Sequence, residues 1–281
     1  MSYLNKIKQC NQVDFQHYLP FYVDKQQYGW LHSDFAAELA AWEDIFLIED
    51  NSVTFSDEFD DYASRSQAIA PVLVSLHEQG VIDSWVGEAY PVNHEYGQQG
   101  VMEIERAAAQ YFGVQTYGVH INGLVRKQEE TYVWIAERAK DKPYYPGKLD
   151  QIVAGGQPVG ISLMDNVIKE SQEEANIPKS LASQARARGF VQYQMESKRG
   201  IEASTLFNFD CWLPENFEPE NTDGEVDSFQ LVHINELAEL TDTTDKFKTN
   251  CNLTNIDLLI RAGVIDDKHP DYKEIVEMLY C

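Results

Sequence analysis

The chain has 281 residues, 22 of them Lys or Arg and 46 Asp or Glu, so its formal net charge is −24 with histidine neutral. This length suits about two domains, and 43% hydrophobic residues are enough for buried cores, which excludes a disordered chain. The acidic excess is spread evenly over both halves, favours solubility, and excludes a non-specific nucleic-acid binder and an anionic membrane surface as partners.

The N-terminal part is predicted to mix helices and strands. Apolar residues at helical spacing, with glycines as stops, indicate its helices. We expect helices at residues 34–46, 64–79 and 103–112 and strands at 51–55 and 85–92. The composition becomes strand-rich near residue 116, so we predict one domain at 1–115 and a second at 116–281.

The second part opens with a predicted hairpin, 116–126 and 131–136, around a polar KQEE turn. An ordered loop is expected at 142–150. Further along we expect strands at 152–154, 190–194, 205–213 and 229–234 and helices at 163–176, 181–188, 245–262 and 270–279.

The four cysteines, Cys10, Cys211, Cys251 and Cys281, are scattered without a CxxC pair or metal spacing. This favours reduced thiols and a cytoplasmic protein. The N-terminal segment lacks the apolar run of a signal peptide, and no stretch approaches the ~18 apolar residues of a membrane span. We therefore expect no membrane partner.

Three glutamates stand out in the segment GGQPVGISLMDNVIKESQEEANI, residues 155–177. On a helix, Glu170, Glu173 and Glu174 share an arc of roughly 100°. Such an oxygen-ligand set suits Mg²⁺ or Mn²⁺, and without a cation the carboxylates would repel one another. The alternative is a solvated acidic helix face that contains a Lys169–Glu173 ion pair.

Glycines precede this helix. Gly155 and Gly156 follow a predicted strand, and Gly160 lies in the loop. Glycine lets the backbone approach phosphate oxygens, and the start of a helix offers free amide donors. We therefore expect Gly155, Gly156 and Lys169 to contact substrate.

The whole pattern resembles the Nudix box, the signature of hydrolases that cleave a diphosphate linked to another moiety. Lys169 occupies the arginine position, and the three helix glutamates are present. Ile161 stands where the family has its loop glutamate, which favours weak catalysis. Asn176 replaces the closing glycine, and asparagine can adopt the same left-handed conformation.

The resemblance extends to a subfamily related to thiamine pyrophosphokinase-associated proteins, in which an accessory domain precedes the Nudix domain. The segments that carry it are 112–125, 142–160, 169–178, 213–229 and 247–265. It implies an α/β class fold: a Nudix α/β/α sandwich after a smaller α+β domain that walls the pocket or forms a homodimer interface. It further implies Mg²⁺ or Mn²⁺ as cofactor and a small-molecule diphosphate as substrate.

The resemblance also implies roles for individual residues. Glu170, Glu173 and Glu174 are the expected metal ligands, and Glu170, Glu174 and Glu225 the expected catalytic residues. Glu225, in Asp-Gly-Glu-Val before a predicted strand, is either a metal ligand or general base, or one more acid in an acidic loop.

Other residues admit two interpretations each. Lys148 is either a phosphate contact or an ordinary surface lysine. His120, on a predicted strand, is more often structural. Several strand aromatics either stack on a ring of the substrate or belong to the core: Tyr117, Phe207, Phe209 and Trp212.

The function expected from the resemblance is hydrolysis of thiamine diphosphate, or of its oxo and oxy analogues, to the monophosphate and phosphate. Two alternatives stay open. One is hydrolysis of a nucleoside diphosphate derivative, such as a nucleotide sugar or dinucleotide. The other is a catalytically weak Nudix fold used for ligand binding.

Overall fold

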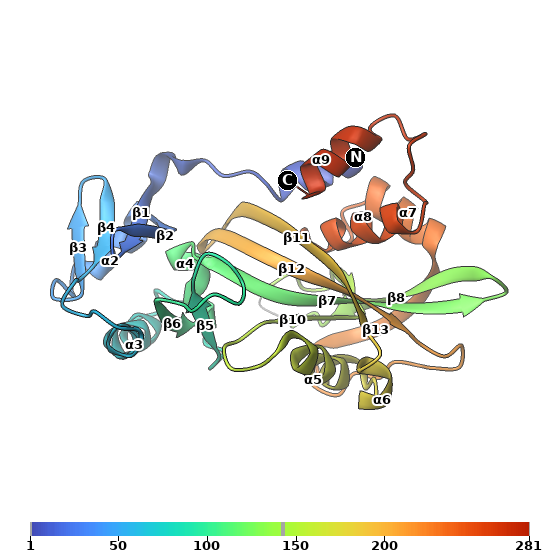
Figure 1. The fold of residues 1–281 in the computed structure, drawn as a ribbon, viewed down its shortest axis with the longest axis horizontal. Coiled ribbons are helices and arrows are strands. Elements are labelled where there is room, and N and C mark those ends of the chain that lie inside the picture. Colours follow the sequence, from blue (N-terminus) through green and yellow to red (C-terminus); the bar gives the residue numbers. More distant parts are fainter. Residues whose placement is uncertain (1, 142–143, 281) are drawn as a thin grey trace.

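The computed structural model describes residues 2–141 and 144–280, and the architecture given below refers to these residues. The largest sheet has seven strands, ordered β11-β12-β7-β8-β13 along its main path, with β10 paired to β7 and β9 paired to β8 (Figure 1). Its strands are β7 (Gln115–Lys127), β8 (Glu130–Arg138), β9 (Leu149–Gln151), β10 (Val153–Gly156), β11 (Arg186–Ser197), β12 (Gly200–Trp212) and β13 (Val226–His233).

Strand β7 organises this sheet. One edge pairs in parallel with β12, and the other edge is divided between β10 and β8, which are both antiparallel to it. The predicted hairpin between β7 and β8 is confirmed. Gln128 and Glu129 both have positive φ angles, as a tight two-residue hairpin turn requires.

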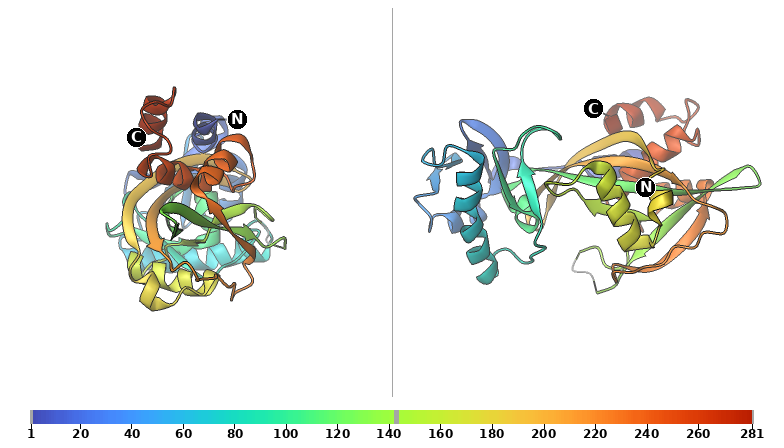
Figure 2. Two further views of the ribbon diagram at one scale, coloured as in Figure 1. Left: turned by 90° about the vertical axis from the view of Figure 1, so that its right-hand side faces the viewer. Right: turned by 60° about the horizontal axis from the view of Figure 1, so that its bottom comes forward.

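Helices cover both faces of the sheet (Figures 1 and 2). Val119, Ile121 and Val125 of β7 lie in a core shared with α5 and α6, whereas Leu124 lies in a core shared with α1, α7, α8 and α9. Successive side chains of a strand point to opposite faces, so one strand serves both cores. The predicted α/β/α sandwich is confirmed. Its helices are α5 (Leu163–Ala175), α6 (Lys179–Ala182), α7 (Ile234–Thr243), α8 (Cys251–Arg261) and α9 (Tyr272–Tyr280).

Residues 18–114, called here the N-terminal region, have a separate core. Phe112 lies at its centre, with ring centroids 5.3 Å from those of Phe21 and Phe35. A four-stranded sheet ordered β2-β1-β4-β3 and the hairpin β5-β6 form this region with its helices. Its elements are β1 (Tyr18–Val23), β2 (Gln26–His32), α2 (Ser33–Leu39), β3 (Phe46–Glu49), β4 (Ser52–Phe55), α3 (Tyr62–Glu78), β5 (Ala89–Val92), β6 (Met102–Glu105) and α4 (Ala109–Phe112).

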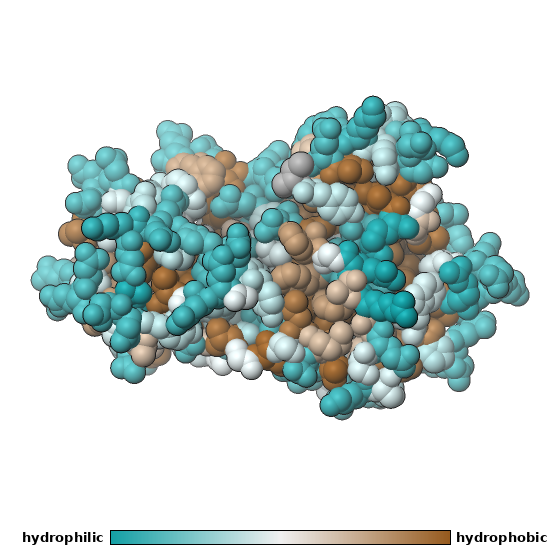
Figure 3. All heavy atoms as spheres, viewed as in Figure 1, coloured by the Kyte–Doolittle hydropathy of each residue, from teal (hydrophilic) through white to brown (hydrophobic). Residues whose placement is uncertain are grey.

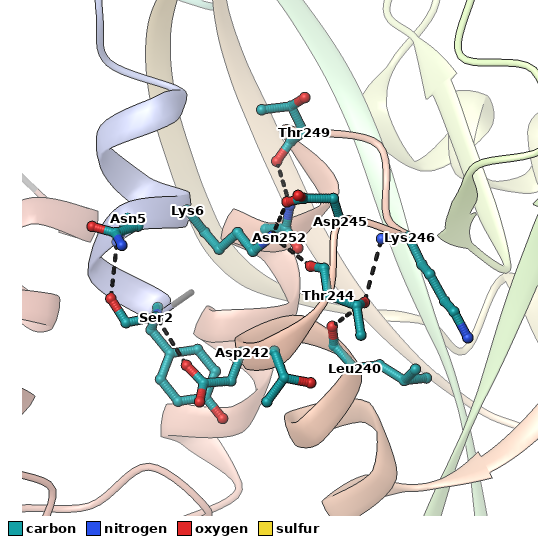
Figure 4. Close-up of polar contacts among 12 residues, drawn as sticks. Ser2, Asn5, Lys6, Leu240, Asp242, Thr244, Asp245, Lys246, Thr249 and Asn252 are labelled. Atoms are coloured by element: carbon teal, nitrogen blue, oxygen red, sulfur yellow. Dashed lines mark hydrogen bonds and ion pairs between the residues drawn. The ribbon is translucent and has the colours of Figure 1, made fainter.

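The first helix, α1 (Tyr3–Gln9), packs on the helices at the other end of the chain (Figure 4). The Lys6 ammonium is 1% exposed and contacts both the Asp245 carboxylate and the Thr244 carbonyl oxygen at 2.5 Å. The Tyr3 N–H donates to Asp242 Oδ1 at 3.1 Å. The N- and C-terminal helices thus share one layer of the sandwich (Figure 1).

Several predicted helices are wrong in extent or type. The helix at 34–46 ends at Leu39, and the one at 103–112 begins late: β6 runs to Glu105, and a 3₁₀ turn over Arg106–Ala108 then leads into the short α4. The helix at 181–188 is also wrong, because Arg186 begins β11 and pairs with Asp210 of β12. At Arg186 and Ala187 pairing with β12 overrides helix propensity.

Differences at the C-terminal side are smaller. The helix at 245–262 begins only at Cys251, and α7 was not predicted. The loop expected at 142–150 includes residues 142 and 143, which lie outside the described residues, and its end forms β9. None of the helices in the described part of the chain has the length and apolar character that a membrane span needs.

The hydropathy of the surface changes along the molecule. In the view of Figure 3, hydrophobic side chains gather in the middle of the molecule, between ends that are mostly hydrophilic. Cys10, Cys211 and Cys251 are buried free thiols, and Cys281 lies outside the described residues.

Candidate active site

The segment that resembles the Nudix box forms a strand, a loop and a helix. β10 ends at Gly156, the loop follows, and the Ser162 side chain caps α5 by accepting from the Asp165 N–H. α5 ends at Asn176, whose φ of 50° is left-handed. Asparagine therefore adopts here the conformation that glycine usually provides at a helix end, as predicted.

Glu170 points from α5 onto the backbone of β10. A Cβ placed on Gly155 would lie 2.3 Å from Glu170 Cδ and 2.6 Å from its Oε2. Only glycine leaves room for this carboxylate, which is nearly buried at 8% exposure. Burial raises the pKa of Glu170, although the Lys169 ammonium, 2.9 Å from its Oε1, opposes the shift.

Glu174 lies one turn further along the same face of α5. Its Oε2 accepts the Ala154 N–H at 2.9 Å. Burial holds its pKa well above the usual range, and the charges of Glu170, Asp150 and Glu225 raise it further. The fold therefore brings Glu225 from the turn before β13 into the electrostatic environment of α5.

Glu225 is held at that turn by its backbone. Its N–H donates to Asp223 Oδ1 at 2.8 Å, and its carbonyl oxygen accepts the Ala139 N–H at 3.0 Å. We call Glu170, Glu174 and Glu225 the carboxylate cluster.

Glu173 lies at the edge of this arrangement. Its side chain is 49% exposed and forms an ion pair with Lys169 at 3.0 Å. Lys169 thus bridges Glu170 and Glu173, and these hydrogen bonds raise its pKa although burial lowers it. The Lys169–Glu173 pair exists beside the cluster, so Glu173 would have to leave Lys169 to bind a metal.

Lys148 has another partner in this structure. Its ammonium donates to the Asp245 carbonyl oxygen at 2.5 Å. A contact between Lys148 and a phosphate would require the side chain to give up this bond.

Sequence reasoning missed the contribution of the N-terminal region. A Cβ on Gly156 would lie 1.7 Å from the Tyr90 hydroxyl oxygen and 2.9 Å from Arg106 Cζ. Arg106 forms an ion pair with Glu88 at 2.8 Å, and its charge lowers the pKa of Glu170. No sequence signal marks these residues, because Arg106 lies in a segment predicted to be an ordinary helix.

Asp150 is the other residue that was missed. It is 4% exposed and pairs with Arg138 at 3.2 Å. Its burial would raise its pKa, but Lys248, His120 and Arg138 together lower it. His120 is structural, as the more common interpretation held: its Nδ1 lies 2.6 Å from Gln151 Oε1, and burial lowers its pKa to about 4.

His120, Asp150 and Cys251 could also be considered as metal ligands, since their ligand atoms lie within 4.8 Å of one another. However, Cys251 Sγ donates to Asp150 Oδ1 at 2.8 Å, and Asp150 is already paired with Arg138. This group is therefore a hydrogen-bonded cluster with its charge balanced by cationic side chains.

The carboxylate cluster, in contrast, has the donor chemistry of a hard divalent cation site, although its three carboxylates do not all lie within 4.8 Å of one another. It offers carboxylate oxygens only, which Mg²⁺ and Mn²⁺ prefer. The raised pKa of the buried Glu174, with other carboxylates nearby, shows that its ionised form is disfavoured here, and a bound cation would stabilise that form.

Comparisons with known proteins identify the family. A family model described as "Domain of unknown function (DUF4743)" matches residues 2–116. The chain is 38% identical over 282 residues to Nudix hydrolase 24, chloroplastic, of Arabidopsis thaliana, covering 99% of this chain and 77% of that protein. It is 36% identical over 290 residues to Nudix hydrolase 20, chloroplastic, of the same plant, with the same coverage.

A solved structure, the Nudix domain of Shewanella oneidensis NrtR with ADP-ribose, aligns with a TM-score of 0.42 at 12% identity, covering 54% of this chain and 90% of that one. The two plant relatives match this chain over nearly its whole length, and the segment at 155–177 forms the loop and helix that the Nudix box implies. The chain is a hydrolase that belongs to the Nudix family.

Proposed function

We propose that this enzyme hydrolyses the diphosphate of thiamine diphosphate, or of its oxo and oxy analogues, to the monophosphate and phosphate, with Mg²⁺ or Mn²⁺ as cofactor. The observation that carries the catalytic part is the buried carboxylate of Glu174, which lies one helical turn from Glu170 against β10 and is influenced by the charge of Glu225. The choice of substrate rests on the resemblance to the thiamine-related subfamily.

Glu170 and Glu174, with Glu225 and a rearranged Glu173, would hold the metal. When bound, the cation neutralises charge on the diphosphate and on the leaving phosphate. The backbone of Gly155 and Gly156 approaches the phosphate oxygens. Lys169 keeps Glu170 in place through its 2.9 Å contact.

Glu225 is the proposed general base. A carboxylate oxygen takes a proton from the attacking water while the water oxygen bonds to phosphorus and the bridging P–O bond breaks. The position of Glu225 on a turn fixed by two backbone hydrogen bonds suits this role. In this proposal Arg106, 38% exposed beside Gly156, contacts a phosphate oxygen. Lys148 would do the same after leaving the Asp245 carbonyl oxygen.

We also propose that 1–115 and 116–281 are the two domains, the second carrying the catalytic residues. The separate core of the N-terminal region supports this division, while α1 packs with the second part. Buried free thiols support a reducing compartment, and we propose the cytoplasm. A homodimer through the N-terminal region is part of the same proposal.

Phosphate release tests the proposal. A panel of thiamine diphosphate, its oxo and oxy forms, ADP-ribose, a nucleotide sugar and a nucleoside triphosphate would be assayed with Mg²⁺. We expect the thiamine compounds to give the highest kcat/KM, and Glu174→Gln to lower it about 100-fold or more.

The control is Glu239→Gln, which makes the same charge change at an exposed position on α7, on the far face of the sheet. Highest activity on a nucleotide derivative would support the nucleoside diphosphate alternative. Binding of thiamine diphosphate without turnover of any compound would support the ligand-binding alternative.

A further inference from the structure

A cavity of about 390 Å³ lies where the N-terminal region meets the loop after β10. One side is formed by Tyr62 of α3 and the segment between β5 and β6, and the other by Tyr117 of β7 and the loop that ends at Ile161. Two hydrogen bonds join the sides: Val159 N–H to the Ala89 carbonyl oxygen at 2.9 Å, and the Tyr117 hydroxyl to Asn93 Oδ1 at 2.8 Å. The two parts of the chain therefore build this cavity together.

The described residues that line the cavity include no Asp, Glu, Lys or Arg. Their polar groups are tyrosine hydroxyls and the amides of asparagine and glutamine. A diphosphate needs cations or dense amide donors, so the cavity does not suit the phosphates. It suits the uncharged part of a ligand.

Aromatic rings form much of the wall. The Tyr96 ring, 40% exposed, packs edge-on against Tyr117 at 5.4 Å and against Phe207 at 4.9 Å between centroids. Tyr62 contributes a third ring to the lining. Exposed aromatic walls of this kind bind flat rings by stacking.

Gln157 supplies a specific polar feature. The residue lines the cavity and is only 2% exposed. Its Nε2 donates to the Ile161 carbonyl oxygen at 2.7 Å, which leaves Oε1 as an acceptor, and Oε1 has no hydrogen-bond partner. A buried acceptor without a donor is costly. Oε1 has almost no accessible surface, so a ligand N–H would satisfy it after a small turn of the side chain toward the cavity.

A short stretch of chain links the cavity to the carboxylate cluster. Gln157 follows Gly156 directly, and Gly155 contacts Glu170. Consecutive Cα atoms are about 3.8 Å apart, so Gln157 and Gly155 are at most about 7.6 Å apart. A ring in the cavity and a diphosphate at the cluster can belong to one small molecule.

We propose that this cavity is the recognition site for the organic group of the substrate, and that it takes a flat aromatic ring bearing an N–H donor, with Tyr96 as a stacking wall and Gln157 Oε1 as the acceptor. This inference rests on the proposed function for the position of the diphosphate. Ring binding itself needs neither metal nor turnover.

The first test is therefore metal-free calorimetry with ring compounds that lack phosphate: thiamine, adenosine and N6,N6-dimethyladenosine. We expect thiamine or adenosine to bind, and whichever binds identifies the ring class. Tyr96→Ala is expected to weaken this binding at least about fivefold. The matched control is Trp85→Ala, an aromatic of the same region that is 41% exposed and outside the lining.

The acceptor is tested separately. For a ring that bears a free amino group, Gln157→Met is expected to weaken binding about tenfold. If adenosine is the ligand, loss of the donor in the dimethyl compound should weaken binding to the wild type, and Gln157→Met should abolish that difference.

The second test measures hydrolysis as a ratio, kcat/KM for the ring-bearing diphosphate over kcat/KM for methyl diphosphate. We expect the ratio to fall in Tyr96→Ala and to stay constant in Trp85→Ala. An unchanged ratio, or no ring binding to the wild type, would overturn the inference. If no diphosphate is hydrolysed but ring binding is lost in Tyr96→Ala, the cavity assignment stands and the proposed function fails.

Discussion

Gly155 and Glu174 show how single residues prepare this site. Gly155 leaves space that the Glu170 carboxylate fills. The nearly buried Glu174 carboxylate accepts a hydrogen bond from the Ala154 N–H. Both glutamates have raised pKa values, with burial as the first cause. Ionisation of both carboxyl groups is therefore unfavourable without a cation, and the proposed cation is what would stabilise their charged forms.

The first prediction concerns Gly155→Ala. The added methyl group would displace the Glu170 carboxylate, because it would lie 2.3 Å from Cδ. We expect kcat/KM to fall about 100-fold, with little change in the melting temperature, since the carboxylate end of Glu170 can move. The double variant Gly155→Ala/Glu170→Gln should be no less active than Glu170→Gln alone. Additive losses would show that Gly155 acts independently of Glu170.

The second prediction concerns acid stability. His120 is buried and neutral, with a pKa of about 4 compared with 6.5 for an ordinary histidine. Between these values the unfolded chain binds the proton that the folded chain does not, so stability decreases as the pH falls from about 6.5 to about 4. This loss is up to about 3 kcal/mol. Urea unfolding of His120→Gln should lack this part of the pH dependence, and curves parallel to wild type would contradict it.

At the level of elements, short contacts between distant segments decide the architecture. β10 and α5 come from one continuous segment, but β13 brings Glu225 to them and β5 brings Tyr90. α1 fills a layer that otherwise consists of C-terminal helices. Loss of such an element would open a core without touching the catalytic segment.

The third prediction compares two variants at α1. Asp245→Ala removes the carboxylate that contacts the buried Lys6 ammonium, whereas Lys6→Met leaves the Asp245 carboxylate, whose side chain is 53% exposed, in contact with water. We therefore expect Asp245→Ala to lower the urea midpoint more than Lys6→Met. The control is Lys8→Met, whose pair with Glu274 at 3.4 Å is half exposed and should contribute little. The opposite order would refute the explanation.

For the whole molecule, the charge of −24 has two components. Most of it surrounds the protein and favours solubility. A small part is concentrated at the carboxylate cluster, where the N-terminal region and the sandwich meet at Gly156. Binding of an anionic substrate to this acidic site would be electrostatically favourable only with a cation present.

The fourth prediction is that Mg²⁺ stabilises the fold through the cluster. At a Mg²⁺ concentration 100 times its Kd, the free energy of unfolding should rise by about 2.7 kcal/mol. Glu174→Gln should remove this increase. NaCl at the same ionic strength is the control, because salt also screens the general repulsion of an acidic chain. Equal stabilisation by NaCl, or by Mg²⁺ in Glu174→Gln, would place the effect outside the cluster.

Local chemistry allowed a large part of this structure to be predicted. The hairpin around Gln128 and Glu129, the box helix α5 and its left-handed end at Asn176 follow from turn preferences and helical periodicity. Helix propensity gave a wrong prediction where the segment pairs as a strand, as at Arg186. These outcomes share one reason: a local pattern predicts an element only when no distant partner competes for its backbone.

The sequence by itself predicted the glutamate-bearing helix, because helical periodicity depends on residues that are neighbours in the chain. The resemblance of that segment to the Nudix box implied the family and the sandwich. Only the tertiary structure decided that Tyr90 and Arg106 reach Gly156, that Lys148 donates to Asp245, and that Glu225 acts on Glu174. Each of these contacts joins residues about 50 or more positions apart. Such contacts follow from how the elements pack, and no periodicity along the chain encodes them.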